Sequence, residues 1–577
     1  VRPSPFHRLF QGAGPQVTHG LPAALFLEPV SSYTGHGMVG FRADISRWFT
    51  DTFAGESPIQ KLAWPVIHRG ESCLLTAPTG SGKTFAAFLS LIDTLARMGS
   101  RGELADTIYA VYITPLKALG NDIHRNLLQP LQELKDRDPA FPDIRVAVRS
   151  GDTPQSERAR MVRRPPHILI TTPESLFLVL GSKRLAPALA SVRTVIVDEV
   201  HALCSDKRGV HLAVSLERLE ERTGGMQRLG CSATINPLED VALYLGGFDD
   251  TGQPRPCRII DAGVRKRLDV KVAVPSRDMV TMNNTSLWNS AYEILQDEIA
   301  AHDTTLIFCN SRYKAERTSL HLSESGGSAA PIGVHHGSVS KELRLEMEAK
   351  LKAGDLKALV TTSSLELGID IGSVNLVYQL ESPKSVAAAL QRIGRSGHLL
   401  DATSTGRILV FDRDEPAEAA AISKAMVAGD VDEIAIPKGG IDVLAQQLAG
   451  AVSVEPRRVD SLPRMARRTY PYSRFSAEGF DQVVALLSGE YKFDMAYPPR
   501  PLVMWDRISN TLNPARGATH VTSMNVGTIE DPSEYEVVID ASKKRIGRIE
   551  SDFVDDSLRS GDIFVLGSSH WKVLGKR

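Results

Sequence analysis

The sequence contains few cysteines, and their spacing forms no metal-binding pattern. The five are Cys73, Cys204, Cys231, Cys257 and Cys309. No two of them form the close pair that a structural zinc or iron–sulfur site uses, and no histidine cluster accompanies them. Four of them lie in short apolar runs, as is typical of buried thiols in a reducing compartment. We therefore expect no such metal site, and we expect a cytoplasmic protein.

Long apolar runs and an excess of one charge are also missing. No apolar stretch approaches the roughly 18 residues that a membrane-spanning helix needs, and the run Leu21–Leu27 is too short for a signal peptide. The chain has 67 lysines and arginines against 68 aspartates and glutamates, for a formal net charge of -1. A protein that bound phosphate over its whole surface would be basic. Any site for a polyanion must therefore be a local track.

Two blocks of short apolar runs and longer amphipathic stretches make up most of the chain. In the first block we expect strands at Ser72–Ala77, Ile108–Thr114, Ile144–Ser150, His167–Thr172, Val192–Val197 and Arg228–Ser232. In the second we expect strands at Thr304–Cys309, Pro331–His335, Ala358–Thr362, Leu376–Gln379 and Arg407–Phe411. Apolar strands between helices indicate a parallel sheet covered on both faces. We predict two tandem doubly wound α/β domains, 41–250 and 251–430, with the linker and its approach in 251–284.

Both ends of the chain differ in texture from these blocks. Residues 1–40 are rich in Pro, Gly, Ser and His, and we interpret them as a loose leader. Residues 431–500 have helical patterns, such as Gly440–Ala451 and Ala477–Leu487. Residues 501–577 alternate like β-strands, at 527–529, Glu534–Ile539, Lys544–Ile549 and Asp562–Val565. Residue 1 is not Met, so we interpret the chain as a fragment or as one that begins at a non-standard start codon. Because the β-like pattern stops soon after Trp571, we expect a C-terminal truncation that leaves the β-rich domain incomplete.

The segment 77–84 has the sequence of a phosphate-binding loop. It consists of Ala77, Pro78, Thr79, Gly80, Ser81, Gly82, Lys83 and Thr84. It stands between an apolar strand and a helix that we expect at Thr84–Leu95. Glycines let the backbone approach a phosphate, and amides at the helix N-terminus point toward it. We expect the whole loop to bind ATP, with Lys83 on the β- and γ-phosphates and Thr84 on Mg²⁺.

Two acids end another strand of the first block. Asp198 and Glu199 follow the apolar run Val195–Val197. In a nucleotide hydrolase the first acid holds Mg²⁺, and the second orients and deprotonates the attacking water. We assign these roles to Asp198 and Glu199. Upstream, Gln60 offers a donor and an acceptor that suit adenine. The residue that stacks on adenine stays open among Phe41, Trp48, Phe49 and Phe53.

The second block supplies the other half of the predicted nucleotide site. The segment Gln391–His398 reads Gln-Arg-Ile-Gly-Arg-Ser-Gly-His. An arginine that reaches across a cleft stabilises charge on a transferring phosphoryl group, and we assign this role to Arg395. We expect Gln391 near the γ-phosphate and its water, and Asp370 to line the nucleotide site. Coupling of nucleotide state to domain spacing is assigned to His201, Ser232 and Thr234.

The motifs of both blocks resemble those of superfamily 2 helicases in order and spacing, over residues 41–430. They are Ala77–Thr84, Thr114–Leu119, Thr171–Glu174, Asp198–His201, Ser232–Thr234, Phe308–Arg312, Thr361–Asp370 and Gln391–His398. The resemblance implies two RecA-like domains that share one ATP. Many members end the last motif in an arginine that serves as a second finger. Residue 398 is histidine here, so a finger is missing or replaced.

Narrower features resemble the large helicase-related (Lhr) family of DNA helicases. They are the Asp-Glu-Val-His box at 198–201, His335–Ser338, Ser364–Asp370, the Gly-His ending at 398, Asp442–Leu448, and Trp505–Arg507 with Gly527–Ile529. The last two are similar to the family's winged-helix module and to the start of its fourth, β-rich domain, which we place at 431–500 and 501–577. The resemblance implies 3′-to-5′ translocation on single-stranded DNA and unwinding of DNA duplexes or RNA:DNA hybrids, with a role in DNA repair.

We expect the nucleic-acid surface to follow the strand ends of both blocks. A motor must ignore base sequence, so its contacts should go to the sugar–phosphate backbone. Hydroxyls, backbone amides and a few cations bind phosphates without a large net charge. The predicted contacts are Thr114, Pro115, Lys117, Arg149, Gly151 and Thr172 on the first block, and Ser311, Arg312, His336 and Thr362 on the second.

Two further features allow two interpretations each. Six arginines and three aromatic rings lie between 455 and 475. They suit a single strand, or a solvated helix face with a Tyr-Pro-Tyr turn that anchors a core. Trp505 stacks on a base, as the family resemblance implies, or belongs to a core.

Rival functions also remain at this point. A DEAD-box-like RNA helicase would share most motifs, but the Asp-Glu-Val-His box and the winged-helix-like segment speak against it. A non-catalytic ATP-gated DNA clamp would not need Lys83, Glu199 and Arg395. A shortened chain could also be an inert fragment.

Overall fold

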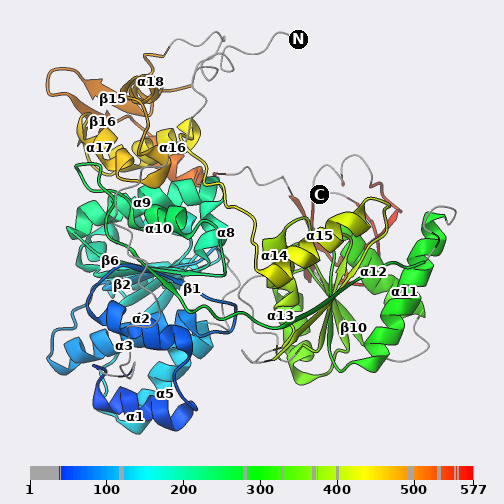
Figure 1. Cartoon of the computed structure of the whole chain (residues 1–577). Coiled ribbons are helices and arrows are strands. Elements are labelled where there is room, and N and C mark those ends of the chain that lie inside the picture. Colours follow the sequence, from blue (N-terminus) through cyan, green and yellow to red (C-terminus); the bar gives the residue numbers. More distant parts are fainter. Residues whose placement is uncertain are drawn as a thin grey trace.

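The computed structural model describes most of the chain as two α/β bodies side by side, with a smaller body stacked on the first (Figure 1). The described residues are 38, 40–115, 123–276, 278, 283–325, 331–366, 372, 374–397, 402–491, 499–528, 534–542, 544–550, 554 and 558–575. Among them, no helix has both the length and the apolar character to cross a membrane. The predicted contacts Lys117 and Asp370, the motif residue His398 and most of the leader lie outside them.

The first α/β domain is built on a seven-stranded parallel sheet with the order β3-β4-β2-β5-β6-β1-β7. Its strands are β1 (Cys73–Thr76), β2 (Ala110–Ile113), β3 (Val146–Arg149), β4 (Ile168–Thr171), β5 (Thr194–Val197), β6 (Gln227–Ser232) and β7 (Arg258–Asp261). Its helices are α1 (Ala43–Thr52), α2 (Pro58–His68), α3 (Lys83–Ser100), η3 (His124–Leu128), α5 (Gln129–Arg137), α6 (Gln155–Arg163), α7 (Pro173–Leu180), η4 (Ala186–Ser191), α8 (Val200–Cys204), α9 (Lys207–Thr223) and α10 (Leu238–Gly246). Helices α2 and α3 cover one face of the sheet, and α8, α9 and α10 cover the other (Figure 1).

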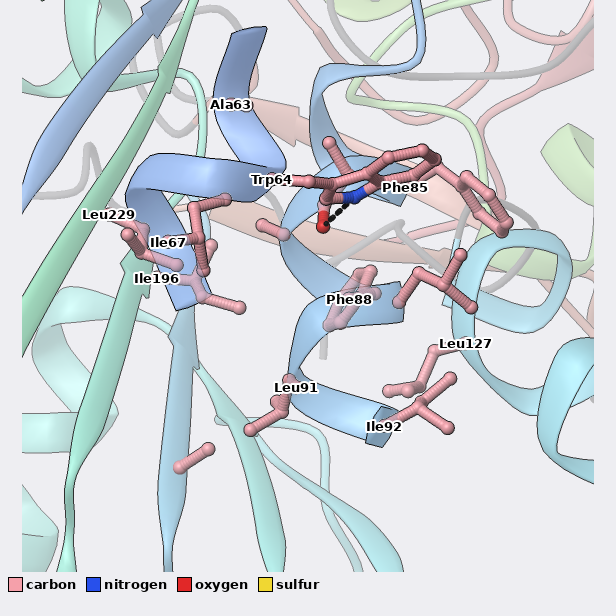
Figure 2. Close-up of a cluster of buried hydrophobic side chains, with 14 of the residues drawn as sticks. Ala63, Trp64, Ile67, Phe85, Phe88, Leu91, Ile92, Leu127, Ile196 and Leu229 are labelled. Atoms are coloured by element: carbon pink, nitrogen blue, oxygen red, sulfur yellow. Dashed lines mark hydrogen bonds between the residues drawn. The ribbon is translucent and has the colours of Figure 1, made fainter. Parts of the chain in front are cut away.

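Packing of α2 and α3 fixes the start of the phosphate-binding loop. Trp64 of α2 is fully buried, and its Nε1 donates a 3.0 Å hydrogen bond to the carbonyl oxygen of Ala86 in α3 (Figure 2). Phe88 and Ile92 of α3 are also fully buried. Burial of one such side chain contributes about 1.5–3 kcal/mol. This packing therefore fixes the position of α3, the helix that begins with Lys83.

The second α/β domain repeats this plan with a six-stranded parallel sheet of order β10-β11-β9-β12-β13-β8. Its strands are β8 (Leu268–Ala273), β9 (Thr305–Phe308), β10 (Ile332–His335), β11 (Ala358–Thr361), β12 (Leu376–Leu380) and β13 (Ser404–Leu409). Its helices are α11 (Asn284–Ala301), α12 (Arg312–Ser325), α13 (Lys341–Ala353), η5 (Ser363–Leu365), α14 (Val386–Ile393) and α15 (Glu415–Ala428). Two doubly wound sheets are therefore confirmed.

The interpretation of 251–284 as linker needs correction, because two strands lie there. Strand β7 pairs with β1 in the first sheet, and β8 pairs with β13 in the second. Only 262–267 connects them. Both strands stand at sheet edges, where partial exposure permits polar residues, so they lack the continuous apolar pattern of the central strands. The first domain accordingly extends through Asp261.

A third body, the winged-helix-like unit, follows the second domain in sequence but packs on the first (Figure 1). Its elements are α16 (Ile441–Val452), β14 (Arg457–Arg458), α17 (Ser461–Arg467), η6 (Tyr470–Tyr472), α18 (Ala477–Ser488), β15 (Val503–Asp506), β16 (Thr511–Pro514) and α19 (Ala518–Met524). The antiparallel sheet β14-β16-β15 joins strands from both sides of residue 500. The segments 431–500 and 501–577 therefore share one sheet, and α19 is a helix in a stretch for which strands were expected.

The arginine-rich segment 455–475 faces the first domain. Buried Glu217 of α9 forms ion pairs with Arg468 at 3.0 Å, with Arg255 at 2.7 Å and with Arg228 at 2.8 Å. Tyr472 is fully buried within the unit's core. The structure thus favours the anchoring interpretation over a track for a single strand. The unit is fastened to the first domain by this ion-pair network.

The last described segments return to the second domain. They form two hairpins, β17 (Glu534–Val538) with β18 (Arg545–Glu550), and β19 (Ile563–Val565) with β20 (His570–Lys572). The backbone of Ser340 donates a 3.0 Å hydrogen bond to Ile546, and that of Arg548 donates a 2.7 Å bond to Ser338. Strands were expected at 534–539, 544–549 and 562–565; described residues 527 and 528 lie in no strand.

Candidate nucleotide and nucleic-acid sites

The phosphate-binding loop is shaped by two glycines in left-handed conformation. Gly80 has φ 82° and Gly82 has φ 87°, values that side chains with a Cβ rarely adopt. A Cβ on Gly82 would lie 2.6 Å from Nε2 of Gln60. Gln60 itself is 7% exposed, and its Oε1 accepts a 2.8 Å hydrogen bond from the backbone of Ser57 at the start of α2. The predicted adenine-binding side chain is therefore held directly against the loop.

Lys83 points back into the loop that precedes it. Its Nζ donates hydrogen bonds to the carbonyl oxygens of Ala77 at 2.6 Å and Pro78 at 2.9 Å. Burial lowers the pKa of Lys83, while the nearby Glu199 carboxylate opposes this shift. These two carbonyls hold the ammonium where a phosphate would replace them as its partner.

The two acids and Thr84 meet at the ends of β1 and β5. The Thr84 hydroxyl lies 3.4 Å from Oδ2 of Asp198, which also accepts a hydrogen bond from the Tyr112 hydroxyl. Burial raises the pKa of both Asp198 and Glu199, and the Glu199 charge raises that of Asp198 further. A hydroxyl and a carboxylate at this spacing are the oxygen ligands that Mg²⁺ takes.

The second domain reaches this site through α14. The amide Nε2 of Gln391 lies 2.6 Å from Nε2 of His201. The charge of Arg395 acts on Lys83 and Glu199, and its Nη2 donates a 2.7 Å hydrogen bond to the backbone oxygen of Glu366. The structure thus brings Gln391 and Arg395 to the loop and the acids, as the sequence predicts.

His201 connects the residues to which coupling was assigned. Its Nδ1 lies 3.1 Å from the Ser232 hydroxyl and accepts a 3.3 Å hydrogen bond from the backbone N–H of Ala233. Burial, and then the Lys83 charge, lower its pKa to about 4, so the ring is neutral near pH 7. Since Nδ1 accepts, the ring proton is on Nε2, the ring atom that faces the Gln391 amide. Thr234 is exposed nearby.

The structure adds two observations at the candidate nucleotide site, one that distinguishes among the four aromatic candidates and one on Lys266, which was not singled out in the sequence. Of the four aromatic candidates for adenine stacking, Phe53 is the exposed ring, at 40%, and it lies 5.2 Å from Phe85 of α3 between ring centres. Lys266, in the connector 262–267, donates hydrogen bonds to Gly394 and Gly397 on either side of Arg395. Exposure and long-range contact, which a sequence pattern does not carry, identify them.

On the first domain, the predicted nucleic-acid contacts lie along one edge of the sheet. Thr114 follows β2 and Thr172 follows β4, and Nη1 of Arg149 is buried with no hydrogen-bond partner among the described residues. Arg158 braces the next loop by donating a 2.8 Å hydrogen bond to the carbonyl of Gly151.

Arg208 was not predicted as part of this edge. It donates hydrogen bonds to the Pro115 carbonyl at 2.9 Å and to Glu174 at 2.6 Å, and so ties two of the loops together.

On the second domain, three of the four predicted contacts lie at the equivalent edge. Ser311, Arg312 and Thr362 follow β9 and β11, and Nη1 of Arg312 donates a 3.0 Å hydrogen bond to the Ser338 hydroxyl. His336 differs, because its side chain is 1% exposed and bonded to Glu316 at 2.8 Å. As placed, His336 supports the loop from within and does not reach a phosphate.

Trp505 occupies the hairpin of the winged-helix-like unit. Its ring packs partly against the unit's core, and the Arg507 guanidinium lies 3.4 Å from the ring centre. Nε1 donates a 3.2 Å hydrogen bond to Asn510. A base could stack on Trp505 only if Arg507 moved or formed the outer layer of the stack.

Comparison with family models matches the described architecture in three parts. Residues 57–241 match the DEAD/DEAH box helicase model, and 289–399 match the helicase conserved C-terminal domain. Residues 424–575 match the winged helix domain of the large helicase-related protein, a span that includes both sides of residue 500.

Known proteins resemble the chain over almost its whole length. It is 45% identical over 535 residues to the "ATP-dependent helicase Lhr-Core" of Methanothermobacter thermautotrophicus, covering 91% of this chain and 61% of that one. It is 39% identical over 574 residues to the "Lhr helicase/ probable uracil glycosylase" of Mycolicibacterium smegmatis, covering 92% of this chain and 37% of that one. The chain thus spans less than two thirds of these relatives.

A solved structure supports the arrangement of domains. The Mycobacterium smegmatis helicase Lhr bound to ssDNA and AMP-PNP superposes with a TM-score of 0.78 at 41% identity, over 86% of this chain and 64% of that one. The DUF1998 helicase MrfA bound to DNA matches with a TM-score of 0.71 at 20% identity, which shows a shared fold.

Proposed function

Since the chain belongs to the large helicase-related family of superfamily 2, we propose that it is an ATP-dependent DNA helicase whose two α/β domains form one motor. The contact between Gln391 of the second domain and His201 of the first carries this proposal. It supports the proposal because it holds α14, and the turn after it that carries Arg395, against His201 beside the two acids. A site divided in this way responds to nucleotide by changing the distance between its halves.

In this proposal the residues of the first domain bind ATP and activate the attacking water. The loop 77–82 and Lys83 hold the phosphates of ATP, and Thr84 with Asp198 hold Mg²⁺, which neutralises phosphate charge when bound. Glu199 is the base that orients the attacking water. Its pKa is raised by burial, which brings it closer to the working pH and improves it as a base. Gln60 and Phe53 hold the adenine.

The residues of the second domain complete the site and report its state. Arg395 stabilises charge on the transferring phosphoryl group. Gln391 contacts His201, and His201 contacts Ser232. A shift of Gln391 when the γ-phosphate binds or leaves is therefore transmitted from α14 to the end of β6. Hydrolysis breaks the bond between the β- and γ-phosphates, and release of the phosphate ion then removes the charge that draws Arg395 toward the loop, so the cleft opens.

The nucleic-acid track runs along the equivalent edges of both sheets. On this track Thr114, Arg149 and Thr172 face one stretch of backbone, and Ser311, Arg312 and Thr362 face the next. The near-neutral charge of the chain fits such a local track. We place Trp505 at the exit of the track as a stacking residue, with Arg507 covering the ring in the absence of a strand.

The finer assignments follow the family. The homologous M. smegmatis helicase was solved with ssDNA, and we propose that this chain translocates 3′ to 5′ on single-stranded DNA. We further propose that it unwinds DNA duplexes and RNA:DNA hybrids and acts in DNA repair.

Strand displacement on tailed duplexes tests this function. Substrates with a 3′ or a 5′ single-stranded DNA tail, each with DNA or RNA as the displaced strand, should be unwound only from the 3′ tail and only with ATP. Lys83→Ala should abolish phosphate release and unwinding while DNA binding is retained. Equal stimulation of ATP hydrolysis by single-stranded RNA would instead support an RNA helicase. DNA binding without ATP turnover in the unaltered protein would support a clamp.

A further inference from the structure

Helix α14 is contacted at both ends by the two segments that connect the domains. The first connector, residues 262–267, runs from β7 to β8, and the second, residues 429–436, runs from α15 toward α16 (Figure 1). Because α14 and the turn after it carry Gln391 and Arg395, these contacts bear on the geometry of the nucleotide site.

The first connector holds the C-terminal end of α14. Nζ of half-buried Lys266 donates hydrogen bonds to the carbonyl oxygens of Gly394 at 3.2 Å and Gly397 at 2.8 Å. The two glycines flank Arg395. A cation that binds the carbonyls at the end of a helix is placed favourably in the helix dipole.

The second connector holds the N-terminal end. Oδ2 of Asp432 accepts hydrogen bonds from the backbone N–H groups of Val386 at 2.7 Å and Ala387 at 3.1 Å. An anion at these free amides is likewise favourable. α14 therefore has an acid at one end and a lysine at the other, each from a different connector.

The second connector is at the same time attached to the first domain. The backbone N–H of Ile434 donates a 2.7 Å hydrogen bond to the carbonyl oxygen of Asn236, and Asn236 forms a parallel bridge with Glu433. Ile436 is buried in a core cluster of the first domain. Asn236 stands two residues beyond Thr234, so the connector joins the loop after β6 to the start of α14.

We propose that Lys266 and Asp432 are positioning residues, one from each connector, that hold α14 so that Arg395 and Gln391 face the nucleotide. This inference rests on the proposed function. Lys266 also supplies a positive charge beside Arg395 in a family member whose last motif ends in histidine. Burial lowers the pKa of Lys266, and the charges of Arg395 and Lys83 lower it further.

The test compares neutral and conservative variants at both positions. Lys266→Met and Asp432→Ala should each lower kcat for DNA-stimulated ATP hydrolysis by about tenfold, a small part of the 10³–10⁵ that an arginine finger contributes. KM for ATP and the affinity for AMP-PNP should stay within about twofold, because the loop and Lys83 bind the ground state. Lys266→Arg and Asp432→Asn should recover most of kcat, because each keeps the donor or the acceptor.

Neighbouring residues in the same connectors serve as matched controls. Arg265 donates a 2.7 Å hydrogen bond to the carbonyl oxygen of Ala428 at the end of α15, and Asp430 is exposed. Arg265→Met and Asp430→Ala should leave kcat unchanged. On an Arg395→Ala background, Lys266→Met should have little further effect, because it acts through that arginine.

Several outcomes would overturn the inference. They are unchanged kcat in Lys266→Met and Asp432→Ala, equal losses in the conservative variants, and a fall in AMP-PNP affinity that matches the fall in kcat. If circular dichroism shows that a neutral variant is unfolded, the inference is tested instead with the conservative variant at the same position and with the Arg395→Ala, Lys266→Met double variant. If the unaltered protein shows no DNA-stimulated ATP hydrolysis, the proposed function fails first, and that failure is seen before any variant is made.

Discussion

The two α/β domains can be compared strand by strand, and they agree at the edge predicted to bind nucleic acid. In the first domain the Thr171 hydroxyl donates a 2.9 Å hydrogen bond to the carbonyl oxygen of Arg149. In the second, the Thr361 hydroxyl donates a 2.9 Å bond to that of His335. The register of β3 with β4 is the same as that of β10 with β11. The same arrangement of strand ends is therefore present in both domains.

They differ at the edge proposed to bind the nucleotide. β1 continues into the glycine-rich loop, whereas its counterpart β8 continues into Val274 and Pro275. The register makes Glu199 and Glu381 equivalent, and both have left-handed backbones, with φ 48° and 65°. Glu199 faces Lys83 and Arg395, whereas Glu381 is paired with Lys314. The second domain thus has the same strand ends and the same left-handed turn, at Glu381, as the first. It has no glycine-rich loop after β8, and its contribution to the proposed nucleotide site is the Arg395 cation.

The largest expected effect separates these two glutamates. Glu199→Gln should lower kcat for ATP hydrolysis by at least about a hundredfold, because it removes the general base. Glu381→Gln, at the equivalent turn, should change kcat less than about twofold. Phosphate release with saturating single-stranded DNA measures both. A similar loss in both variants would show that the turn, and not the base, governs the rate.

A smaller and equal effect is expected at the shared edge. Arg149→Ala and Arg312→Ala should each weaken binding of single-stranded DNA several-fold. Each should lower the slope of log affinity against log salt by about 0.7, the amount that one neutralised phosphate contributes on a single strand. Fluorescence anisotropy from low to moderate salt measures this. Weaker binding without a change of slope in one domain would break the equivalence of the two tracks.

The smallest effect concerns acid stability, in which the domains also differ. Burial lowers the pKa of His211 in the first domain to about 3, and its Nε2 has no hydrogen-bond partner among the described residues. In the second domain burial also lowers the pKa of His335, but its hydrogen bond to Glu348 opposes this shift, and His336 is bonded to Glu316. Because unfolding restores the ordinary pKa of His211, the unfolded chain binds more protons as pH falls below 6.5, and stability falls.

His211→Leu should therefore reduce the acid destabilisation of the first domain. Each unit by which a pKa differs between the folded and unfolded chain can change the free energy of unfolding by at most about 1.4 kcal/mol. Urea unfolding at about pH 7.5 and about pH 5, on either side of the ordinary histidine pKa, should show a smaller difference for the variant than for the unaltered protein. An unchanged difference would mean that His211 is already reached by water in the native state.

The sequence predicted those parts that local pattern determines. Central strands are continuous apolar runs, and the loop 77–84 carries its own glycines, so the two sheets and the first half of the nucleotide site could be located. It failed where partners are distant in the chain. Arg468 forms an ion pair with Glu217, which lies 251 positions earlier in the chain. Because local sequence does not reveal such a distant partner, the arginine-rich segment could be interpreted in two ways. β7 and β8 stand at sheet edges, so their sequences lack the continuous apolar pattern that identifies the central strands.

Side-chain direction was the other limit. His336 follows β10 like its predicted neighbours at the strand ends, yet it turns inward to Glu316. The same limit applies to Phe53, which spacing could not separate from three buried rings.

The domains remain neighbours whatever the state of the cleft, because one chain passes between them repeatedly. Connectors 262–267 and 429–436 cross, and the chain passes again between residue 528, beside the winged-helix-like unit, and β17, whose partner β18 lies on the second domain. Such tethering sets a high effective concentration of one domain at the other, in the millimolar range for short linkers. A contact as small as Gln391 with His201, too weak to join two separate proteins, is then enough to register closure. For the proposed motor, we therefore expect small changes at this contact to alter kcat for ATP hydrolysis more than the affinity for nucleotide.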